Sequence, residues 1–284
     1  MTPGAILRAE LAKGVVIAPG VYDALSARAA AKAGAKSIYM SGFGVAGSLL
    51  GVPDIGLVSA TEMIERVRAL SVACAPVPLI ADGDNGYGGP LNVERLVHAY
   101  EQAGAAAIQL EDQVMPKRCG HMDGKEIVPR DEAVAKIKAA VAARASKDFL
   151  IIARTDAVSV AGLDEALHRG DAFIAAGADL LFVEAPRSET ELRAVADRFK
   201  GVPLVANMVE GGKTPVLDVK ALGEMGYRLI LYPITALLAV TRALERVYAS
   251  VGTDGLDRVS FDAYCDLVGL PVYLAEARKF AKPQ

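Results

Sequence analysis

Short apolar runs alternate along this chain with longer, Ala-rich amphipathic segments. Buried strands of parallel sheets have continuous apolar runs, whereas amphipathic segments of three or more turns predict helices. Eight runs predict strands, at Val15–Ala18, Ser37–Ser41, Pro78–Asp82, Ala106–Glu111, Phe149–Arg154, Leu180–Glu184, Pro203–Ala206 and Arg228–Tyr232. Eight segments between and after them predict helices, at Ala24–Ala33, Ala60–Ala73, Val93–Ala103, Arg130–Arg144, Leu163–Ala176, Glu189–Arg198, Val219–Met225 and Thr235–Val251.

Three of the predicted helices end on the same tripeptide. Ala-Gly-Ala stands at 33–35, 103–105 and 176–178, and an apolar run follows each time. The glycine occupies the position after a helix where a positive φ is favoured. This repeated strand–helix unit predicts an α/β fold of the (β/α)₈ TIM-barrel type. An open doubly wound sheet is the alternative.

Two stretches interrupt the repeat, Gly42–Ser59 and Gln113–Pro129. Both follow predicted strands, so both belong to the carboxyl-terminal face of a barrel, where long loops carry function. After Val251, Ser260–Val268 and Val272–Ala281 predict extra C-terminal helices that could pack on a partner subunit. We therefore expect a catalytic barrel domain at 1–251 and a helical extension at 252–284.

The length and composition fit one large domain. The chain has 284 residues, 52% of them apolar, and a formal net charge of −3, and a single barrel needs about 250 residues. The sequence has no basic stripe of the kind that would predict a nucleic-acid partner. The apolar run near Leu229–Val240 contains Pro233 and is too short to predict a membrane span. Three widely spaced cysteines predict a reducing, cytoplasmic location.

Five consecutive predicted strands end in polar side chains. Because parallel strands end on one rim, these groups should converge there. They are Asp82 and Asp84, Glu111 and Asp112, Arg154 and Asp156, Glu184, and Asn207. Carboxylates held close together need a cation, and oxygen ligands favour Mg²⁺, with Mn²⁺ as an alternative. The three histidines form no zinc pattern.

The second predicted site is the loop Pro116-Lys-Arg-Cys-Gly-His121. Cys119 lies there beside Lys117, Arg118 and His121, and neighbouring cationic groups make a thiol more reactive. Cys74 and Cys265 lie in apolar helical contexts that predict core positions.

Gly42-Phe-Gly-Val-Ala-Gly47 matches the G-x-G-x-x-G pattern of dinucleotide-binding folds. That fingerprint requires a helix to open at once, whereas Gly51-Val-Pro-Asp54 predicts an interruption. A nicotinamide-dependent oxidoreductase is therefore a minor alternative, and the loop could instead hold a carboxylate. No lysine lies inside a predicted strand, which disfavours a Schiff-base aldolase.

From about Arg8 to Val251 the chain resembles the isocitrate lyase/phosphoenolpyruvate mutase superfamily. The motifs are Ser41-Gly-Phe-Gly-Val-Ala-Gly-Ser, Asp82-Gly-Asp-Asn-Gly-Tyr-Gly, Ile108-Gln-Leu-Glu-Asp-Gln, Lys117-Arg-Cys-Gly-His, Ala153-Arg-Thr-Asp and Asn207-Met-Val-Glu-Gly-Gly-Lys-Thr-Pro. The Lys-Arg-Cys-Gly-His string resembles the lyase branch rather than the mutase branch.

The resemblance implies a barrel whose last helix is swapped between subunits of a homo-oligomer, a dimer of dimers. It implies Mg²⁺ at Asp82 and, through waters, at Asp54, Asp84 and Glu111. It further implies that the substrate is bound by Ser41, Gly42, Phe43, Gly120 and Asn207. The catalytic groups that it implies are Tyr39, Lys117, Cys119, His121, Arg154 and Glu184.

The implied reaction is cleavage of a 2-hydroxy dicarboxylate to an α-keto acid, pyruvate, and a second carboxylate. Tyr39 or Glu184 would take the hydroxyl proton, and Cys119 would protonate the departing fragment. Methylisocitrate lyases of the family have Arg where this chain has Leu238, and Glu-Phe-Gly where it has Glu210-Gly-Gly. The resemblance therefore implies a 2,3-dimethylmalate-like or alkylmalate substrate rather than 2-methylisocitrate. Methylisocitrate cleavage and oxaloacetate decarboxylation or hydrolysis remain alternatives within the family.

Overall fold

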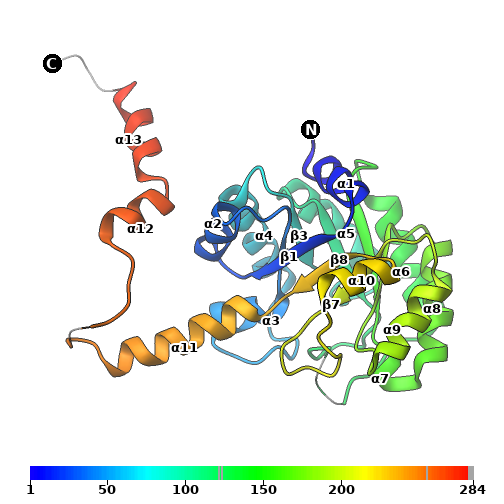
Figure 1. Ribbon diagram of the computed structural model, residues 1–284. Coiled ribbons are helices and arrows are strands. Elements are labelled where there is room, and N and C mark those ends of the chain that lie inside the picture. Colours follow the sequence, from blue (N-terminus) through cyan, green and yellow to red (C-terminus); the bar gives the residue numbers. More distant parts are fainter. Residues whose placement is uncertain (121, 123, 254, 281–284) are drawn as a thin grey trace.

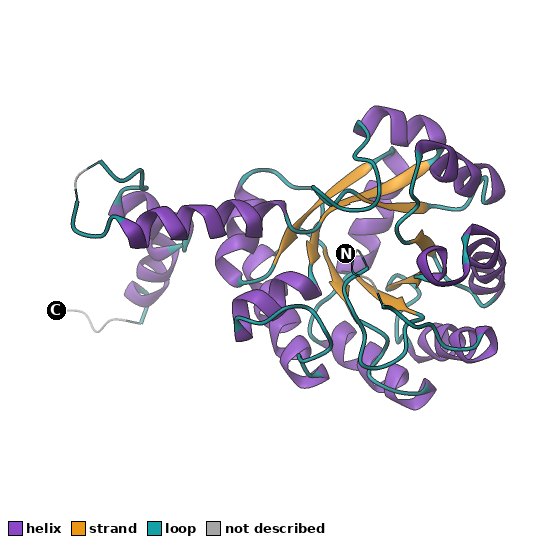
Figure 2. Cartoon of the chain, turned by 90° about the horizontal axis from the view of Figure 1, so that it is seen from below, coloured by secondary structure: helices purple, strands orange, loops and turns teal. Residues whose placement is uncertain are grey.

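Eight parallel strands form a closed barrel in the order of the sequence, β1 to β8, with helices around it (Figures 1 and 2). This arrangement confirms the predicted (β/α)₈ fold and excludes the open sheet. The computed structural model describes residues 1–120, 122, 124–253 and 255–280. His121, one of the predicted catalytic residues, lies outside the described residues.

The observed elements follow the predicted ones closely. The strands are β1 Val16–Val21, β2 Ile38–Met40, β3 Leu79–Asp82, β4 Ala107–Glu111, β5 Leu150–Thr155, β6 Leu180–Val183, β7 Leu204–Asn207 and β8 Tyr227–Tyr232. The helices matching predicted segments are α2 Ala24–Lys32, α4 Ala60–Cys74, α5 Pro90–Gln102, α6 Arg130–Ala143, α8 Leu163–Ala175, α9 Glu189–Arg198, α10 Val219–Met225, α11 Thr235–Ala249, α12 Phe261–Leu267 and α13 Leu270–Arg278.

Side chains alternate between two apolar clusters along each strand. On β6, Leu180 and Phe182 point into the barrel, whereas Leu181 and Val183 pack under the surrounding helices. Both clusters are buried, so the strands need apolar residues on both faces. This burial of both strand faces explains the continuous apolar runs in the sequence.

The helix at the start of the chain was not predicted. α1 (Pro3–Lys13) closes the amino-terminal end of the barrel, where Leu7 is fully buried in the interior cluster (Figure 2). Thr2 caps this helix through its side chain, and Pro3 is its first residue. A threonine followed by proline is a start signal for helices, so the sequence did contain the information.

The three Ala-Gly-Ala glycines have the predicted conformation. Gly34, Gly104 and Gly177 have φ values of +86°, +95° and +97°. Each lets the chain turn from the end of a helix into the next strand, as the sequence predicted.

The loop after β2 is more helical than expected. α3 (Gly42–Val45) opens directly at the first glycine, and a π-helical turn, η1 (Ala46–Leu50), continues it to Gly51. The predicted absence of a helix here was therefore wrong. The closed barrel, which has no second dinucleotide-binding half, argues against nucleotide binding instead. A further short helix, α7 (Ala157–Ala161), follows β5.

The last helices leave the barrel as an arm. α11 points away from the body, and α12 and α13 continue it (Figure 1). None of the three contains a buried residue, although Leu244, Tyr248 and Tyr273 are large apolar side chains. Within the described residues, no helix is long and apolar enough to cross a membrane.

Candidate active site

A pocket of about 260 Å³ opens at the carboxyl-terminal rim of the barrel. Strands β2 to β8 contribute to it directly or through the residues that follow them, and the loop 113–129 supplies one wall. Twelve of the predicted site residues line it, namely Tyr39, Ser41, Phe43, Asp54, Asp82, Glu111, Lys117, Cys119, Gly120, Arg154, Glu184 and Asn207.

Asp82, the last residue of β3, lies at the base of this pocket. Its Oδ2 accepts a hydrogen bond from the Gly42 backbone N–H (3.2 Å), and its Oδ1 accepts one from Gln109 Nε2 (3.3 Å). A Cβ at Gly42 would lie 2.8 Å from Asp82 Oδ2, so a larger residue would force the buried Asp82 carboxylate to move. Burial and the nearby Asp84 carboxylate raise the pKa of Asp82 to about 6. A cation would relieve this repulsion.

Lys117 lies between two of the predicted metal-binding acids. Its Nζ is 2.6 Å from Asp54 Oδ1 and 2.6 Å from Asp84 Oδ1, and all three side chains are buried. Burial alone would lower the pKa of Lys117, but the Asp84 and Asp54 carboxylates raise it well above its usual value. Asp84 adopts a φ of +47° and does not line the pocket itself.

Glu111 ends β4 and is the register partner of Arg154 on β5. Its Oε2 lies 3.3 Å from Arg154 Nη1, while its buried Oε1 has no hydrogen-bond partner among the described residues. Burial raises the pKa of Glu111 well above its usual value. An acceptor buried without a donor is costly, and a cation or its water would satisfy it.

The described residues contain no group of three or more His, Cys, Asp or Glu side chains close enough to hold a metal directly. Magnesium keeps several waters and needs only one or two carboxylates. The separated acids therefore fit a partly hydrated Mg²⁺ better than a zinc site, whose four ligands must all converge.

Arg154, on β5, lies in the pocket wall next to Gly120 of the loop. Burial would lower its pKa, but Asp156, Glu111 and Glu184 raise it well above its usual value. Glu184 Oε2 lies 3.4 Å from Arg154 Nη2 and accepts a hydrogen bond from Asn207 Nδ2 at 3.0 Å. Three neighbouring strands thus deliver an arginine, a glutamate and an amide to one wall of the pocket.

Tyr39 and the segment after it form the side of the pocket next to Asp82. The Tyr39 hydroxyl donates to Gln109 Oε1 (3.1 Å), and burial raises its pKa well above the usual value. Ser41 caps α3 by accepting the Gly44 N–H, and Phe43 faces the pocket.

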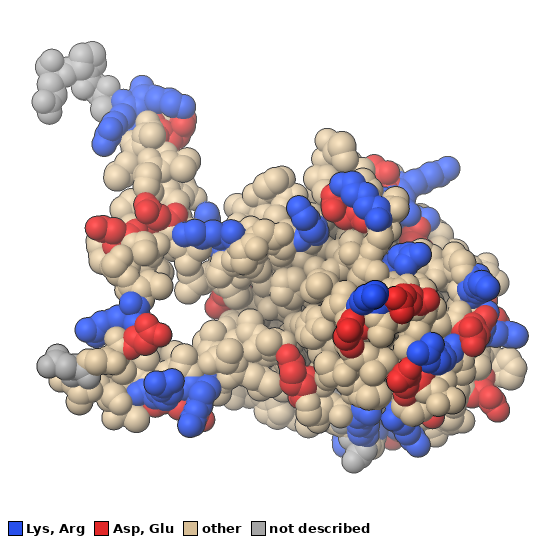
Figure 3. Space-filling model, viewed as in Figure 1, with Lys and Arg blue, Asp and Glu red and all other residues tan. Residues whose placement is uncertain are grey.

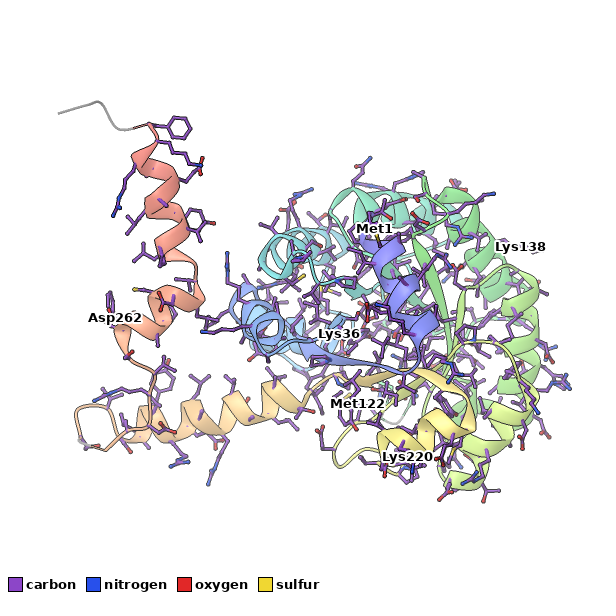
Figure 4. All side chains as sticks on the ribbon, turned by 45° about the horizontal axis from the view of Figure 1, so that its top comes forward. Met1, Lys36, Met122, Lys138, Lys220 and Asp262 are labelled. Atoms are coloured by element: carbon purple, nitrogen blue, oxygen red, sulfur yellow. The ribbon has the colours of Figure 1, made fainter. Side chains whose placement is uncertain are left out.

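Cys119 lines the pocket from the loop 113–129, of which Figure 4 labels Met122, on the side of the barrel away from Met1. The Cys119 backbone N–H donates to the Asp54 carbonyl (3.1 Å), which ties the loop to the one after β2. A side chain at Gly120 would meet Arg154 Nη2 at 2.4 Å and Glu184 Oε2 at 2.7 Å. The loop backbone can approach these groups only because this residue is glycine.

Some pocket residues were not predicted. They are Met122, Val209, Pro233 and Ile234, mainly from the segments after β7 and β8. The polar residues at strand ends could not reveal them, because apolar lining residues look like core residues in a sequence. The segment Glu210-Gly-Gly, which was predicted to bear on substrate choice, also lines the pocket. Leu238, the predicted specificity position, is half exposed and does not line the pocket.

Acids, an arginine and a cysteine-bearing loop gather at the carboxyl-terminal rim of this closed barrel, which is where (β/α)₈-barrel enzymes have their active sites. The family model described as phosphoenolpyruvate phosphomutase matches residues 7–251. The chain therefore belongs to this family, within the PEP mutase/isocitrate lyase superfamily, as the motifs predicted.

Two relatives are lyases. The chain is 46% identical to 2,3-dimethylmalate lyase of Eubacterium barkeri, over 91% of each chain. It is 42% identical to 2-methylisocitrate lyase of Aeropyrum pernix, over 95% of this chain and 89% of that protein. These relatives support the predicted carbon–carbon lyase.

Two solved structures extend the comparison. Oxaloacetate acetylhydrolase in complex with 3,3-difluorooxalacetate superposes with a TM-score of 0.94 and 34% identity, over 100% of this chain and 99% of that one. Phosphonopyruvate hydrolase with oxalate and Mg²⁺ superposes with a TM-score of 0.86 and 33% identity, over 99% and 100%.

Proposed function

We propose that this protein is a Mg²⁺-dependent lyase that cleaves a 2-hydroxy dicarboxylate, of the 2,3-dimethylmalate or alkylmalate type, to pyruvate and a second carboxylate. The observation that carries the proposal is a single pocket lined by the acids Asp54, Asp82, Glu111 and Glu184 together with Arg154 and Cys119. Such a pocket offers a cation site, a counter-charge and a proton donor to one small diacid.

The donor set fits magnesium. Asp82 would contact the ion, and Asp54, Asp84 and Glu111 would hold its waters, with Mn²⁺ as the alternative metal. The raised pKa of Asp82 and the unsatisfied Oε1 of Glu111 are the features that a cation at this place would relieve. Bound there, Mg²⁺ would polarise the 2-hydroxyl and the adjacent carboxylate of the substrate.

Each step of the proposed reaction is then assigned to particular residues of the pocket. Glu184 is the better candidate for the base, because the pKa of Tyr39 is raised by burial and its neutral hydroxyl is suited to donate to the forming carbonyl. When the C2–C3 bond breaks, Arg154 stabilises the developing negative charge. The Cys119 thiol protonates the departing enediolate, and Lys117 and His121 are proposed as further catalytic residues.

The remaining lining residues limit the substrate. Ser41, Gly42 and Phe43 would bind the α-keto carboxylate, with Gly120 and Asn207 beside it. The segments after β7 and β8 offer Val209, Pro233 and Ile234, together with the acidic Glu210.

Among the described pocket residues, the cationic ones are Lys117, Arg118 and Arg154, which lie on the loop and on β5. A third carboxylate near Glu210 would therefore find an acid and apolar side chains. This favours an alkyl-substituted dicarboxylate over the tricarboxylate methylisocitrate. The structural similarity to oxaloacetate acetylhydrolase makes oxaloacetate hydrolysis the second candidate.

A product assay across a substrate panel separates these alternatives. The panel contains 2,3-dimethylmalate, other alkylmalates, 2-methylisocitrate and oxaloacetate, with chromatographic identification of both fragments. We expect pyruvate with a second monocarboxylate from an alkylmalate that carries a methyl group at C2, such as 2,3-dimethylmalate. Oxalate and acetate from oxaloacetate alone would assign the hydrolase, and pyruvate with succinate from methylisocitrate alone would assign the tricarboxylate lyase.

We also propose that the arm completes a homo-oligomer, a dimer of dimers with helices exchanged between subunits. The support is the set of large apolar side chains that α11 to α13 leave exposed, and Figure 3 shows uncharged surface along the arm between its charged groups. The barrel at 1–251 would then be the catalytic domain and 252–284 the assembling extension. The molar mass in solution tests this. A cytoplasmic location remains a prediction from the cysteine content.

A further inference from the structure

The ends of the loop 113–129, called the lid below, pair as a hairpin, and the described residues of the loop are 113–120, 122 and 124–129. Gln113 and Ile127 form an antiparallel bridge, and the Val114 N–H donates to the Glu126 carbonyl at 2.9 Å. The outgoing strand of the hairpin leads to Cys119 and Gly120. The returning strand carries Lys125, which none of the motifs singled out.

Lys125 reaches from the returning strand to two different parts of the molecule. Its Nζ donates to the backbone carbonyl of Gly120 and lies 2.7 Å from Asp156 Oδ1. The side chains of Lys125 and Asp156 are 2% and 0% exposed. A buried ion pair adds little net stability, because removing both charges from water costs about as much as their attraction returns. Positioning of the lid therefore explains the ion pair between Lys125 and Asp156 better than a contribution to stability does.

Asp156 also holds the arginine of the pocket. Its Oδ2 accepts Arg154 Nε and its Oδ1 accepts Arg154 Nη2, each at 3.0 Å. This two-point contact fixes the plane of the guanidinium group. The same carboxylate thus binds Arg154 on the barrel and Lys125 on the lid.

The barrel anchors Asp156 from behind. The Asp156 backbone N–H donates to Asp112 Oδ1 at 2.8 Å, and Asp112 Oδ2 accepts Thr155 Oγ1 at 2.7 Å. Arg169 contacts Asp112 Oδ2 at 3.1 Å and donates to the carbonyl of Val128, at the end of the lid, at 2.9 Å. Both the end of the lid and the partner of Lys125 are therefore fixed to the same rigid part of the rim.

We propose that Lys125 and Asp156 form a latch that holds the lid closed and sets the position of Cys119 relative to Arg154. Gly120 follows Cys119 directly, so a fixed Gly120 carbonyl restricts where the thiol can lie. In this scheme the contact between Lys125 and Asp156 forms when the lid closes and breaks when it opens. Both are positioning residues. Their effect on turnover rests on the function proposed above, whereas their effect on the lid does not.

The test measures lid opening without substrate. Iodoacetamide alkylates Cys119 faster when the lid is open, and mass spectrometry of the Cys119 peptide separates this signal from Cys74 and Cys265. Lys125→Met, which keeps the length and loses the charge, should raise the alkylation rate about tenfold. Lys125→Arg, which keeps the charge and its donors, should restore most of the protection. If Lys125→Met does not fold, Lys125→Gln replaces it, since it keeps a donor and loses the ion pair.

A matched control is Lys136→Met. Lys136 is also a buried lysine, on α6, but its Nζ contacts the Asn85 carbonyl (3.3 Å) and Glu132 (3.8 Å) rather than the lid. Equal acceleration in both methionine variants would show general loosening and overturn the latch, as would a Lys125→Met rate equal to that of the wild type. With an active substrate, Lys125→Met should lower kcat more than it changes KM. Absence of turnover on every diacid would contradict the proposed function and leave the alkylation result intact.

Discussion

Arg154 and Glu111 are register partners on adjacent strands, and Arg154 Nη1 lies 3.3 Å from Glu111 Oε2. Through the same guanidinium, Arg154 also contacts Glu184 and Asp156. One arginine thus touches an acid proposed to hold metal waters, the candidate base and the carboxylate of the latch. The barrel register places these functions within one side chain's reach.

We expect Arg154→Lys to lower kcat/KM about a hundredfold, because an ammonium cannot make the two-point contact with Asp156 while facing the pocket. Steady-state kinetics on the best substrate of the panel measures this. Arg193→Lys is the matched control, since Arg193 forms an exposed pair with Glu189 on α9. Comparable activity of the two variants would contradict the role given to Arg154.

We expect Gly120→Ala to impair catalysis by about tenfold or more, because its Cβ would meet Arg154 Nη2 at 2.4 Å and hold the lid away. Gly89→Ala is the control, since nothing lies within 4 Å of the Cβ it would add. Kinetics and thermal unfolding should show a loss of kcat at Gly120 with little change at Gly89. Full activity of Gly120→Ala would show that the closed lid is not required.

We expect Cys119→Ser to reduce carbon–carbon cleavage at least about a hundredfold, because a hydroxyl is a far weaker acid than a thiol. Cys265→Ser, on α12 of the arm, should retain activity. Pyruvate release at saturating substrate gives the comparison. Near-wild-type cleavage by Cys119→Ser would remove the assignment of Cys119 as the acid.

The acids should make the metal-free protein less stable at high pH. The pKa of Asp82 rises from 3.8 to about 6 on folding, so its contribution is most favourable below about pH 4 and is lost as the pH rises through 6. At about pH 8, metal-free Asp82→Asn should therefore be more stable than the wild type by about 1–3 kcal/mol. Urea unfolding of the wild type and of Asp82→Asn at pH 4 and at pH 8 checks the sign of this stability difference. A variant less stable at pH 8, or an equal difference at pH 4, would be inconsistent with this.

Most of the fold could be predicted from the sequence because a (β/α)₈ barrel repeats one local pattern. Each strand is apolar on both faces, and glycines such as Gly34 and Gly104 mark the ends of helices. α1 was missed because it packs only Leu7 and a few neighbours into the barrel, which leaves a weak periodic pattern. The loop after β2 was misread because its glycines, which usually break helices, form one here.

The candidate site likewise contains residues that could be predicted from the sequence and residues that could not. Charged groups at strand ends, such as Asp82 and Arg154, were predictable because the register of parallel strands brings them to one rim. The contact between Lys125 and Asp156 was not, because it depends on how the lid folds back over the pocket. Pro233 and Ile234 were missed because apolar side chains carry no chemical signature.

The most direct test of the central claim is pyruvate release from 2,3-dimethylmalate by enzyme stripped of metal with a chelator, before and after Mg²⁺ is added. The account predicts that stripped enzyme is inactive, that Mg²⁺ restores cleavage, and that Asp82→Asn shows no restoration. Equal pyruvate release with and without Mg²⁺ would contradict it.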